Sequence, residues 1–166
     1  MALKEFIQPE IIDINDWLRL RKYDGRYELF LPGYQNPVVY QNSEGIFDES
    51  RIPNLDYVKG MCTYLAKVGE LYYIEAKEKD CFIPIGDVTI KDDNPPIAIW
   101  VDNYRGKGIG NLVMQAVINR LKELGFAKIT GSTVYQWNTV SQKLHEGLGF
   151  CKVSEDEKEI IYEREL

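Results

Sequence analysis

The chain has 166 residues, which suits a single domain that buries roughly 70% of the surface its unfolded form exposes. Hydrophobic residues make up 45% of the sequence and charged residues 28%, a composition that excludes a disordered chain. The net charge of −6 argues against a sequence-independent grip on nucleic acid or on an anionic membrane, so neither is expected as a partner.

In the first part of the chain, two periodic segments flank an irregular one. Residues 17–23 alternate apolar and basic side chains with period two, as a half-buried strand does. Proline and glycine interrupt residues 26–53, where we expect at most one short helix, around residues 27–31. From Asn54 to Gly69 the apolar residues recur with the helical period, which predicts a helix that ends at the glycine.

In the second part, strands and helices alternate. The β-rich runs 71–76 and 81–90 are joined by a polar turn and suggest an antiparallel hairpin. We then expect a strand over 97–101, a helix of about four turns that ends at Gly125, a strand over 127–135, a short helix over 139–146, and strands over 150–153 and 159–164. This order predicts one α/β (α+β) domain over residues 1–166, with a mixed sheet of about seven strands.

Further features narrow the class of protein. The start of the chain lacks the apolar run of about 7–15 residues found in signal peptides, and no stretch approaches the roughly 18 apolar residues of a membrane span. A cytoplasmic location is therefore expected. The three cysteines form no Cys-x-x-Cys pair and are expected to be reduced. Because His145 is the only histidine, a metal site and a Ser-His-Asp triad both have little support.

The strongest local signal is the segment Arg105-Gly106-Lys107-Gly108-Ile109-Gly110, between the strand ending at Val101 and the helix that follows. A glycine-rich turn at a helix N-terminus exposes unpaired amides at the positive end of the helix dipole, and such amides bind phosphate. Gly108 and Gly110 fit the close approach of a pyrophosphate, although loop glycines also serve turns with positive φ.

The spacing of the glycines and the local charge narrow the class of phosphate ligand further. A Walker A loop needs Ser or Thr after its lysine, whereas a glycine follows Lys107, and Asn111 stands where a dinucleotide fingerprint needs its third glycine. Residues 105–128 contain five basic residues against one acidic residue, which gives +4 and leaves −10 for the remainder of the chain. We expect the loop cations Arg105 and Lys107 to contact the ligand, and the helix cations, such as Arg120, to coat a solvent face.

The glycine-rich segment resembles the acyl-CoA-binding signature Gln/Arg-x-x-Gly-x-Gly/Ala of the GNAT superfamily of N-acetyltransferases, with Arg105, Gly108 and Gly110 at its specified positions. Residues 138–150 are similar to the second motif of this family. The stretch Ile85-Gly86-Asp87-Val88 resembles the strand before the cofactor strand in the branch of ribosomal-protein N-terminal acetyltransferases. The resemblance implies a mixed sheet with helices on both faces and acetyl-CoA as the cofactor.

By this resemblance, the backbone amides of residues 105–110 bind the pyrophosphate of coenzyme A, and the strand Ile99-Trp100-Val101 pairs with the pantetheine arm. Asn138, Ser141 and His145 share one face of the short helix. The resemblance implies that this face borders the pantetheine, with Asn138 holding it and His145 near the thioester sulfur, where many family members carry a tyrosine as general acid. An imidazolium is able to protonate a thiolate of higher pKa, so His145 either acts as the general acid or only packs against its neighbours.

The general base is harder to place, because the cofactor strand begins with Pro95-Pro96-Ile97-Ala98 and lacks the glutamate that many relatives carry there. Asp87 leads the candidates, ahead of Asp93 and Glu75, since it lies within a strand. The aromatic residues that either line an acceptor pocket or cover the sheet are Tyr23, Tyr27, Phe30, Tyr34 and Tyr40.

We therefore expect an N-acetyltransferase that moves an acetyl group from acetyl-CoA directly to a primary amine, in a small molecule or a peptide. The expected assembly is a monomer or a homodimer. A noncatalytic acyl-CoA-binding module is the alternative, because the glutamate is missing and His145 replaces the tyrosine. A nucleotide-phosphate binder is the third alternative.

Overall fold

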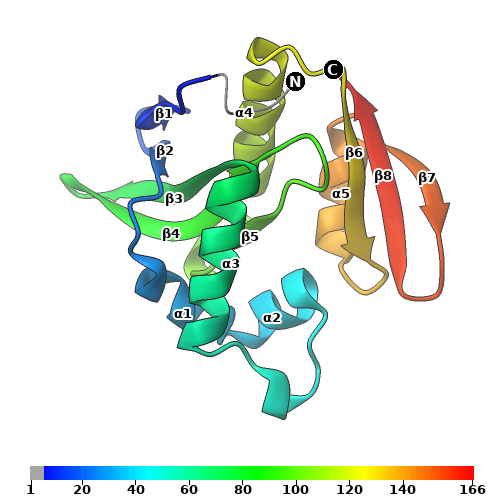
Figure 1. Cartoon of the computed structure of the whole chain (residues 1–166), viewed down its shortest axis with the longest axis horizontal. Helices are drawn as coiled ribbons and strands as arrows, with labels where there is room; N and C mark the ends of the chain where they lie inside the picture. Colours follow the sequence, from blue (N-terminus) through cyan, green and yellow to red (C-terminus); the bar gives the residue numbers. More distant parts are fainter. Residues whose placement is uncertain (1–5) are drawn as a thin grey trace.

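Two antiparallel sheets form the centre of the molecule (Figure 1) in the computed structural model, which describes residues 6–166. The five-stranded sheet has the order β1-β2-β3-β4-β5, with β1 (Ile11–Asp13), β2 (Leu18–Lys22), β3 (Glu70–Glu78), β4 (Cys81–Ile90) and β5 (Ile97–Ile99). The three-stranded sheet has the order β6-β8-β7, with β6 (Lys128–Tyr135), β8 (Glu159–Glu165) and β7 (Cys151–Glu155). Residues 1–5 of the predicted domain lie outside the described residues.

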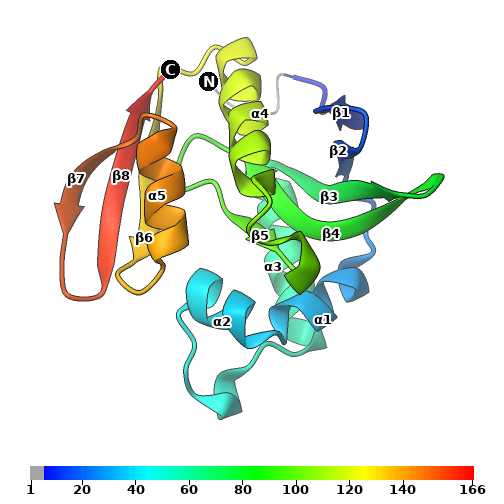
Figure 2. The ribbon, with the colours of Figure 1, turned by 180° about the vertical axis from the view of Figure 1, so that it is seen from behind.

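Helices cover both faces of the five-stranded sheet and one face of the three-stranded sheet (Figure 1, Figure 2). One face carries α3 (Leu55–Val68) together with the shorter elements η2 (Tyr27–Phe30), α1 (Leu31–Tyr34), α2 (Pro37–Glu44) and η3 (Glu49–Arg51). Figure 2 shows α4 (Ile109–Glu123) and α5 (Thr139–Gly147) together on the opposite side, where α5 covers the three-stranded sheet. The turn η4 (Asp102–Tyr104) connects β5 to the glycine-rich loop before α4.

The predicted fold class is confirmed, and most elements lie where the sequence places them. The expected hairpin is formed by β3 and β4, and the helices expected before Gly69 and Gly125 are α3 and α4. There are eight strands in two sheets instead of about seven in one. The additional strand β1 has three residues, too few to show a period of two, and β5 stops at Ile99 because the chain turns into η4.

The prediction of at most one short helix within residues 26–53 is wrong, since η2, α1, α2 and η3 all lie there. The residues interpreted as helix breakers are helix caps. The Asn36 side chain accepts a hydrogen bond from the Val38 amide (3.0 Å), Pro37 occupies the first turn of α2, and Gly45 ends that helix with a φ of +65°. Elements of three to eight residues are too short for periodicity to reveal them.

The two faces of the five-stranded sheet carry separate hydrophobic clusters. Strand alternation directs the side chains of Ile97 and Ile99 to the face covered by α4, and those of Ala98 and Trp100 to the face covered by α3. Both clusters are closed to solvent at their centres, so the two faces of β5 are packed and only its backbone edge is left open.

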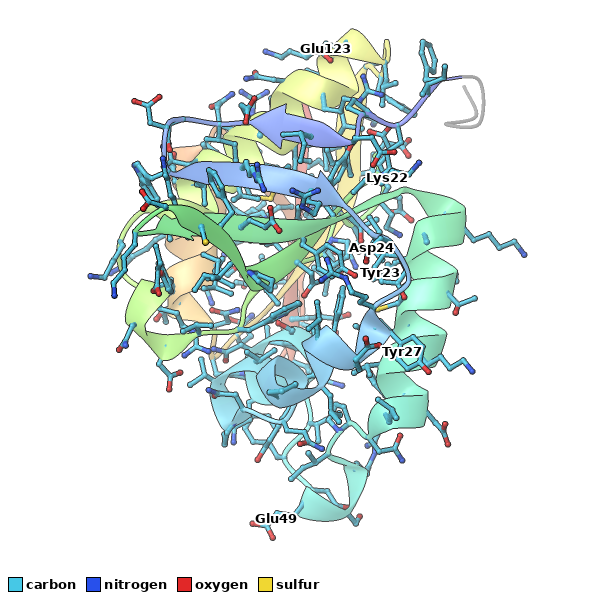
Figure 3. All side chains as sticks on the ribbon, turned by 90° about the vertical axis from the view of Figure 1, so that its left-hand side faces the viewer. Lys22, Tyr23, Asp24, Tyr27, Glu49 and Glu123 are labelled. Atoms are coloured by element: carbon cyan, nitrogen blue, oxygen red, sulfur yellow. The ribbon has the colours of Figure 1, made fainter. Side chains whose placement is uncertain are left out.

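The cluster on the α3 face is largely aromatic. Figure 3 shows Tyr23 and Tyr27 on the segment that runs from β2 towards α3. The Phe30 ring lies 4.8 Å from the Trp100 ring and 6.3 Å from the Tyr34 ring, centroid to centroid. Of the two roles expected for the aromatic residues, covering the sheet is therefore confirmed for Tyr23, Tyr27, Phe30 and Tyr34.

The facing edge strands of the two sheets, β5 and β6, do not pair with each other. Within residues 6–166 a single parallel bridge links the two sheets, between Asp93, in the loop from β4 to β5, and Thr130. The Thr130 amide donates to the Asp92 carbonyl and the Asn94 amide donates to the Thr130 carbonyl, each at 2.8 Å. Beyond this bridge the strands do not pair, so one backbone edge of β5 has no strand beside it.

Candidate active site

The glycine-rich loop leads into an uncapped helix N-terminus. Gly108 is the N-cap residue of α4 and has a φ of +79°, which L side chains rarely adopt. No side chain of residues 6–166 caps this helix, and apart from Gly108, its chain neighbours and the helix's own backbone, no described atom lies within 4 Å of the position that a Cβ on Gly108 would take. The first amides of α4 are thus left for an anion at the positive end of the helix dipole.

Arg105 differs from the expectation that it contacts the ligand. Its guanidinium donates to the Ile99 carbonyl (3.1 Å) and the Trp100 carbonyl (3.2 Å), and it forms an ion pair with Asp102. These bonds hold the loop against the end of β5. The Arg105 guanidinium therefore stabilises the conformation of the loop and is not free for a ligand. Lys107 is exposed and forms no ion pair within the described part of the chain, which leaves it as the loop cation able to reach a phosphate.

The open edge of β5 presents the backbone of Ile99 and Val101. Antiparallel pairing sets Asp87 opposite Ala98, and the Trp100 amide donates to the Ile85 carbonyl (2.7 Å), so Ala98 and Trp100 use their backbone groups towards β4. The amides of the alternate residues point away from β4. Of the three residues expected to pair with pantetheine, Ile99 and Val101 therefore have a free amide on this edge, and Trp100 does not.

The face of α5 singled out by its polar residues is used in part within the chain. The Asn138 side chain accepts a hydrogen bond from the Ser141 amide (3.2 Å) and caps the N-terminus of α5. The Ser141 hydroxyl lies 3.4 Å from Nδ1 of His145, and the Ser141 carbonyl lies 2.7 Å from the same atom. Asn138 is therefore a helix cap, whatever ligand it also meets.

His145 is buried among aromatic rings. Its ring centroid lies 4.8 Å from that of Phe150 and 5.2 Å from that of Tyr162. Because the Ser141 carbonyl only accepts hydrogen bonds, Nδ1 of His145 carries the proton and donates it, and Nε2 of the neutral ring has none to give. Burial lowers the pKa of His145 below its ordinary value, which favours this neutral form. The general-acid role stays a prediction that this geometry does not favour.

Asp87, the expected base, is fully buried on β4. Its carboxylate accepts a hydrogen bond from Trp100 Nε1 (2.7 Å) and from the Tyr34 hydroxyl, which lies 3.0 Å from one oxygen and 3.2 Å from the other. Burial disfavours the charged carboxylate and raises the pKa of Asp87 to about 7, while the two donors act in the opposite direction. A carboxyl with a pKa near neutrality is suited to accept a proton from a substrate.

The sequence does not point to Glu44, which faces the same region from the end of α2. Its carboxylate accepts a hydrogen bond from the Tyr57 hydroxyl, and burial raises the pKa of Glu44 above its ordinary value. The negative charge of Glu44 also raises the pKa of Asp87, Tyr34 and Tyr135. Nothing in the local sequence separates Glu44 from the other surface acids, because its surroundings come from α1, α3, β4 and β6.

The expectation that the basic helix residues coat a solvent face is wrong for Arg120, whereas Lys122 is exposed as expected. The Arg120 guanidinium donates two bonds of 2.8 Å to the carboxylate of Glu70, and both side chains are largely buried. This bidentate pair anchors α4 to β3. Glu70 therefore neutralises the positive charge of Arg120, and Arg120 is not part of a phosphate site.

An uncapped glycine-rich helix N-terminus thus lies beside a free strand edge, an arrangement able to hold a phosphate group next to an extended chain. The sequence profile of the Acetyltransferase (GNAT) family matches residues 37–150. The chain belongs to this family, and the expectation that its cosubstrate is acetyl-CoA is confirmed. The expected alternative of a nucleotide-phosphate binder is thereby set aside. No curated protein sequence gives a significant match to the chain.

Several solved structures share the fold. A domain from Methanocaldococcus jannaschii DSM 2661 is 24% identical with a TM-score of 0.75, covering 90% of this chain and 98% of that one. The Microcin C7 self-immunity acetyltransferase, solved with acetyl-CoA and AMP, is 18% identical with a TM-score of 0.68, covering 95% and 97%. The ribosomal-protein-S5-alanine acetyltransferase from Vibrio fischeri is 15% identical with a TM-score of 0.69, covering 93% and 96%.

These similarities agree with the expected resemblance to ribosomal-protein acetyltransferases, and at such identities they show the fold alone. Within residues 6–166, no helix combines the length and the apolar character needed to cross a membrane.

Proposed function

We propose that the protein is an N-acetyltransferase that moves an acetyl group from acetyl-CoA directly to a primary amine. The observation that carries this proposal is Asp87, a buried carboxyl directly opposite Ala98 of the strand whose other edge is open. Its pKa of about 7 suits the removal of a proton from an alkylammonium ion near neutral pH.

The cofactor side of the proposal uses backbone groups. The amides of residues 106–110 would hold the pyrophosphate, with Lys107 adding a positive charge, and the free amides of Ile99 and Val101 would pair with the pantetheine arm. Acetyl-CoA, when bound, supplies an acetyl group activated as a thioester. The chain's own task is to orient that group and to bring the acceptor to it without its proton.

The proton is proposed to reach Asp87 through Tyr34. Asp87 has no exposed surface, so a hydrogen-bonded neighbour must pass the proton on. Of its two neighbours, the Trp100 indole only donates, whereas the Tyr34 hydroxyl both donates and accepts. Because Tyr34 is itself only 3% exposed, its oxygen would take a proton from the ammonium ion through a bridging water while its hydroxyl gives one to the Asp87 carboxylate. Tyr34 ends neutral, Asp87 ends as a carboxylic acid, and the amine is free to attack the acetyl carbon.

As the C–S bond breaks, the new amide nitrogen loses a second proton. Water is the preferred carrier of this proton to the departing thiolate, since the neutral His145 has its only N–H bonded to a carbonyl. The cytoplasmic location and the monomeric or homodimeric state stay predictions. The acceptor is a small molecule or a peptide that carries a primary amine.

Asp87→Asn is the direct test of this function. Acetylated product, formed from acetyl-CoA and a panel of primary amines, is measured by mass spectrometry, because the exposed Cys81 and Cys151 would react with thiol reagents. We expect the wild-type kcat to rise with pH through about 7, as Asp87 ionises. The variant should lose about 10²- to 10⁴-fold in kcat at neutral pH and keep its affinity for coenzyme A.

The result also separates the enzyme from an acyl-CoA-binding module. Because an amine that has already lost its proton needs no base, the deficit of Asp87→Asn should shrink as the pH approaches the pKa of the acceptor. Wild-type protein that binds coenzyme A but acetylates no amine of the panel would instead support the noncatalytic module. An equal rate in both proteins would remove Asp87 from the mechanism.

A further inference from the structure

Three aromatic side chains gather where the end of β6 meets the segment after α2. Tyr135 and Trp137 are stacked at 4.6 Å with an angle of 4° between their planes, and Phe47 packs edge-on against Trp137 at 5.0 Å. Phe47 is 58% exposed and Trp137 is 39% exposed. We call these three residues the aromatic rim. Large rings at such exposure lie outside both hydrophobic clusters of the fold.

The rim is built from segments about ninety residues apart in the chain, and specific contacts hold them together. Trp137 Nε1 donates to the Gln41 carbonyl of α2 (3.2 Å). A Cβ at Gly45 would lie 2.7 Å from the hydroxyl oxygen of Tyr135, so only glycine lets the two segments approach this closely. Both views of the ribbon show the end of β6 beside α2 (Figure 1, Figure 2). The position of the rim is therefore fixed by the fold.

A carboxylate lies next to the rim. Glu44 directly precedes Gly45 and borders a cavity of about 330 Å³, together with Arg51, Asn54 and Tyr57. Although Arg51 borders the same cavity, no lysine or arginine of residues 6–166 forms an ion pair with Glu44, and burial makes its charge costly. A partly buried carboxylate without an ion-pair partner is complementary to an ammonium ion.

The rim also adjoins α5 and, through Glu44, lies near the proposed base. Trp137 directly precedes Asn138, which caps α5, and the Glu44 charge acts on both Asp87 and Tyr34. Lys158 also lies near the rim, with its Nζ 5.8 Å from the centroid of the Tyr135 ring. Because Tyr135 already has this neighbour, Phe47 is the rim residue with the most surface left for a ligand.

We propose that the aromatic rim and Glu44 form the acceptor subsite, and that the acceptor is a primary amine joined to an aromatic ring. The ring would pack on Phe47 and Trp137, and the ammonium group would be drawn towards Glu44. This inference rests on the proposed function and narrows its substrate class. An aromatic pair adds about 0.5–1.5 kcal/mol beyond the area that it buries, so a two- to ten-fold preference for an aromatic amine is expected.

The test uses two amines that differ only in the ring. The kcat/KM for 2-phenylethylamine should exceed that for 2-cyclohexylethylamine by about two- to ten-fold in the wild-type protein. Phe47→Leu keeps an apolar side chain but removes the ring, and it should abolish this preference. Tyr64→Leu is the matched control, because Tyr64 is also 58% exposed but lies on α3, and it should leave the preference unchanged. Glu44→Gln should weaken both amines to a similar extent.

Each other outcome overturns the subsite. Equal kcat/KM values for the two amines in the wild type, or a parallel loss for both in Phe47→Leu, would make the rim a structural contact only. Self-association that Phe47→Leu abolishes, seen by analytical ultracentrifugation, would assign the rim to a second copy of the chain.

A binding measurement keeps the inference separate from the proposed function. If no amine is acetylated, the proposed function fails, and calorimetric titration of the two amines into coenzyme A-loaded protein decides the subsite alone. Tighter binding of 2-phenylethylamine that Phe47→Leu removes would support it, and equal binding would overturn it.

Discussion

The two sides of the proposed active site differ in the chemical groups they offer, which are backbone amides on the cofactor side and side chains on the acceptor side. On the cofactor side, the open edge of β5 and the first turn of α4 offer backbone amides, and the loop between them turns at Gly106 and Gly108, which both have a positive φ. On the acceptor side, Asp87, Tyr34 and Glu44 offer side chains carried by β4, α1 and α2. A backbone site depends on the local path of the chain, whereas a side-chain site depends on long-range packing. The two sides should therefore fail in different ways when they are mutated.

Gly108→Asp changes the cofactor side of the site, and we expect it to have the largest effect of the variants, a loss of coenzyme A binding. The aspartate carboxylate would take the α4 amides that the pyrophosphate uses, and it would repel the phosphates. We expect no measurable binding of coenzyme A in isothermal titration, with the fold retained by circular dichroism.

Gly25→Asp is the matched control for this change. Gly25 also has a positive φ, of +94°, and open space around its Cβ position, so it imposes a similar backbone strain of about 1–2 kcal/mol. The Gly25→Asp variant should bind coenzyme A with the same affinity as the wild type. A folded Gly108→Asp protein that still bound coenzyme A as tightly as the wild type would show that the phosphates bind elsewhere.

Tyr34→Phe attacks the side-chain side and should act on rate while leaving cofactor binding alone. Removing the hydroxyl breaks the proposed path of the proton to Asp87, so kcat should fall by about 10²-fold. Because Tyr34 and Asp87 act as one unit in this mechanism, combining Tyr34→Phe with Asp87→Asn should cost little more than Asp87→Asn alone. Single-turnover rates of the four proteins at neutral pH give the comparison.

Tyr73→Phe controls for the loss of a hydroxyl in the same cluster. The Tyr73 hydroxyl donates to Asp24 (2.7 Å) and does not contact Asp87, so this variant should keep its rate. If the losses of the two single variants multiplied in the double variant, Tyr34 and Asp87 would act independently and the proton would take another path.

The fold was largely predictable because its longer elements carry their own periodic signals. The stripe from Asn54 to Gly69, the helix before Gly125 and the β3–β4 hairpin all satisfy local rules of capping and alternation. Those rules did not predict the helices of the segment between β2 and α3. Its short helices are stabilised by packing on the sheet, and the proline and glycine that mark their ends are also the residues of loops.

The site was predictable to the extent that it is local. Glycine spacing next to a strand located the phosphate loop, but it did not show that Arg105 turns back onto β5. Asp87 was found as a strand carboxylate, yet its pKa of about 7 comes from burial beneath residues far away in the sequence. Glu44 and the aromatic rim gave no signal, since their significance lies in which residues the fold brings to them.

His145 lies on α5, at the border of the two sides, and His145→Phe should have the smallest effect on turnover. The wild-type ring is neutral and its N–H is bonded to the Ser141 carbonyl, so the ring offers no proton to the thiolate. Phenylalanine fills similar space against Phe150 and Tyr162. We expect kcat and the Kd for coenzyme A to stay within a few-fold of the wild type. A loss of about 10²-fold in kcat with unchanged Kd would make His145 the general acid.

The same variant should show a pH-dependent gain in stability, and its sign follows from the lowered pKa of His145. Because burial favours the neutral ring, the unfolded chain binds a proton at this residue that the folded chain does not, once the pH falls below about 6.5. The wild type therefore loses stability as the pH falls through this range, and His145→Phe removes that loss. The Tm difference, followed by circular dichroism, should move in favour of the variant between about pH 7.5 and about pH 5.5. A difference that stayed constant over this range would mean that His145 takes up its proton equally in the folded chain, which would restore it as a proton donor.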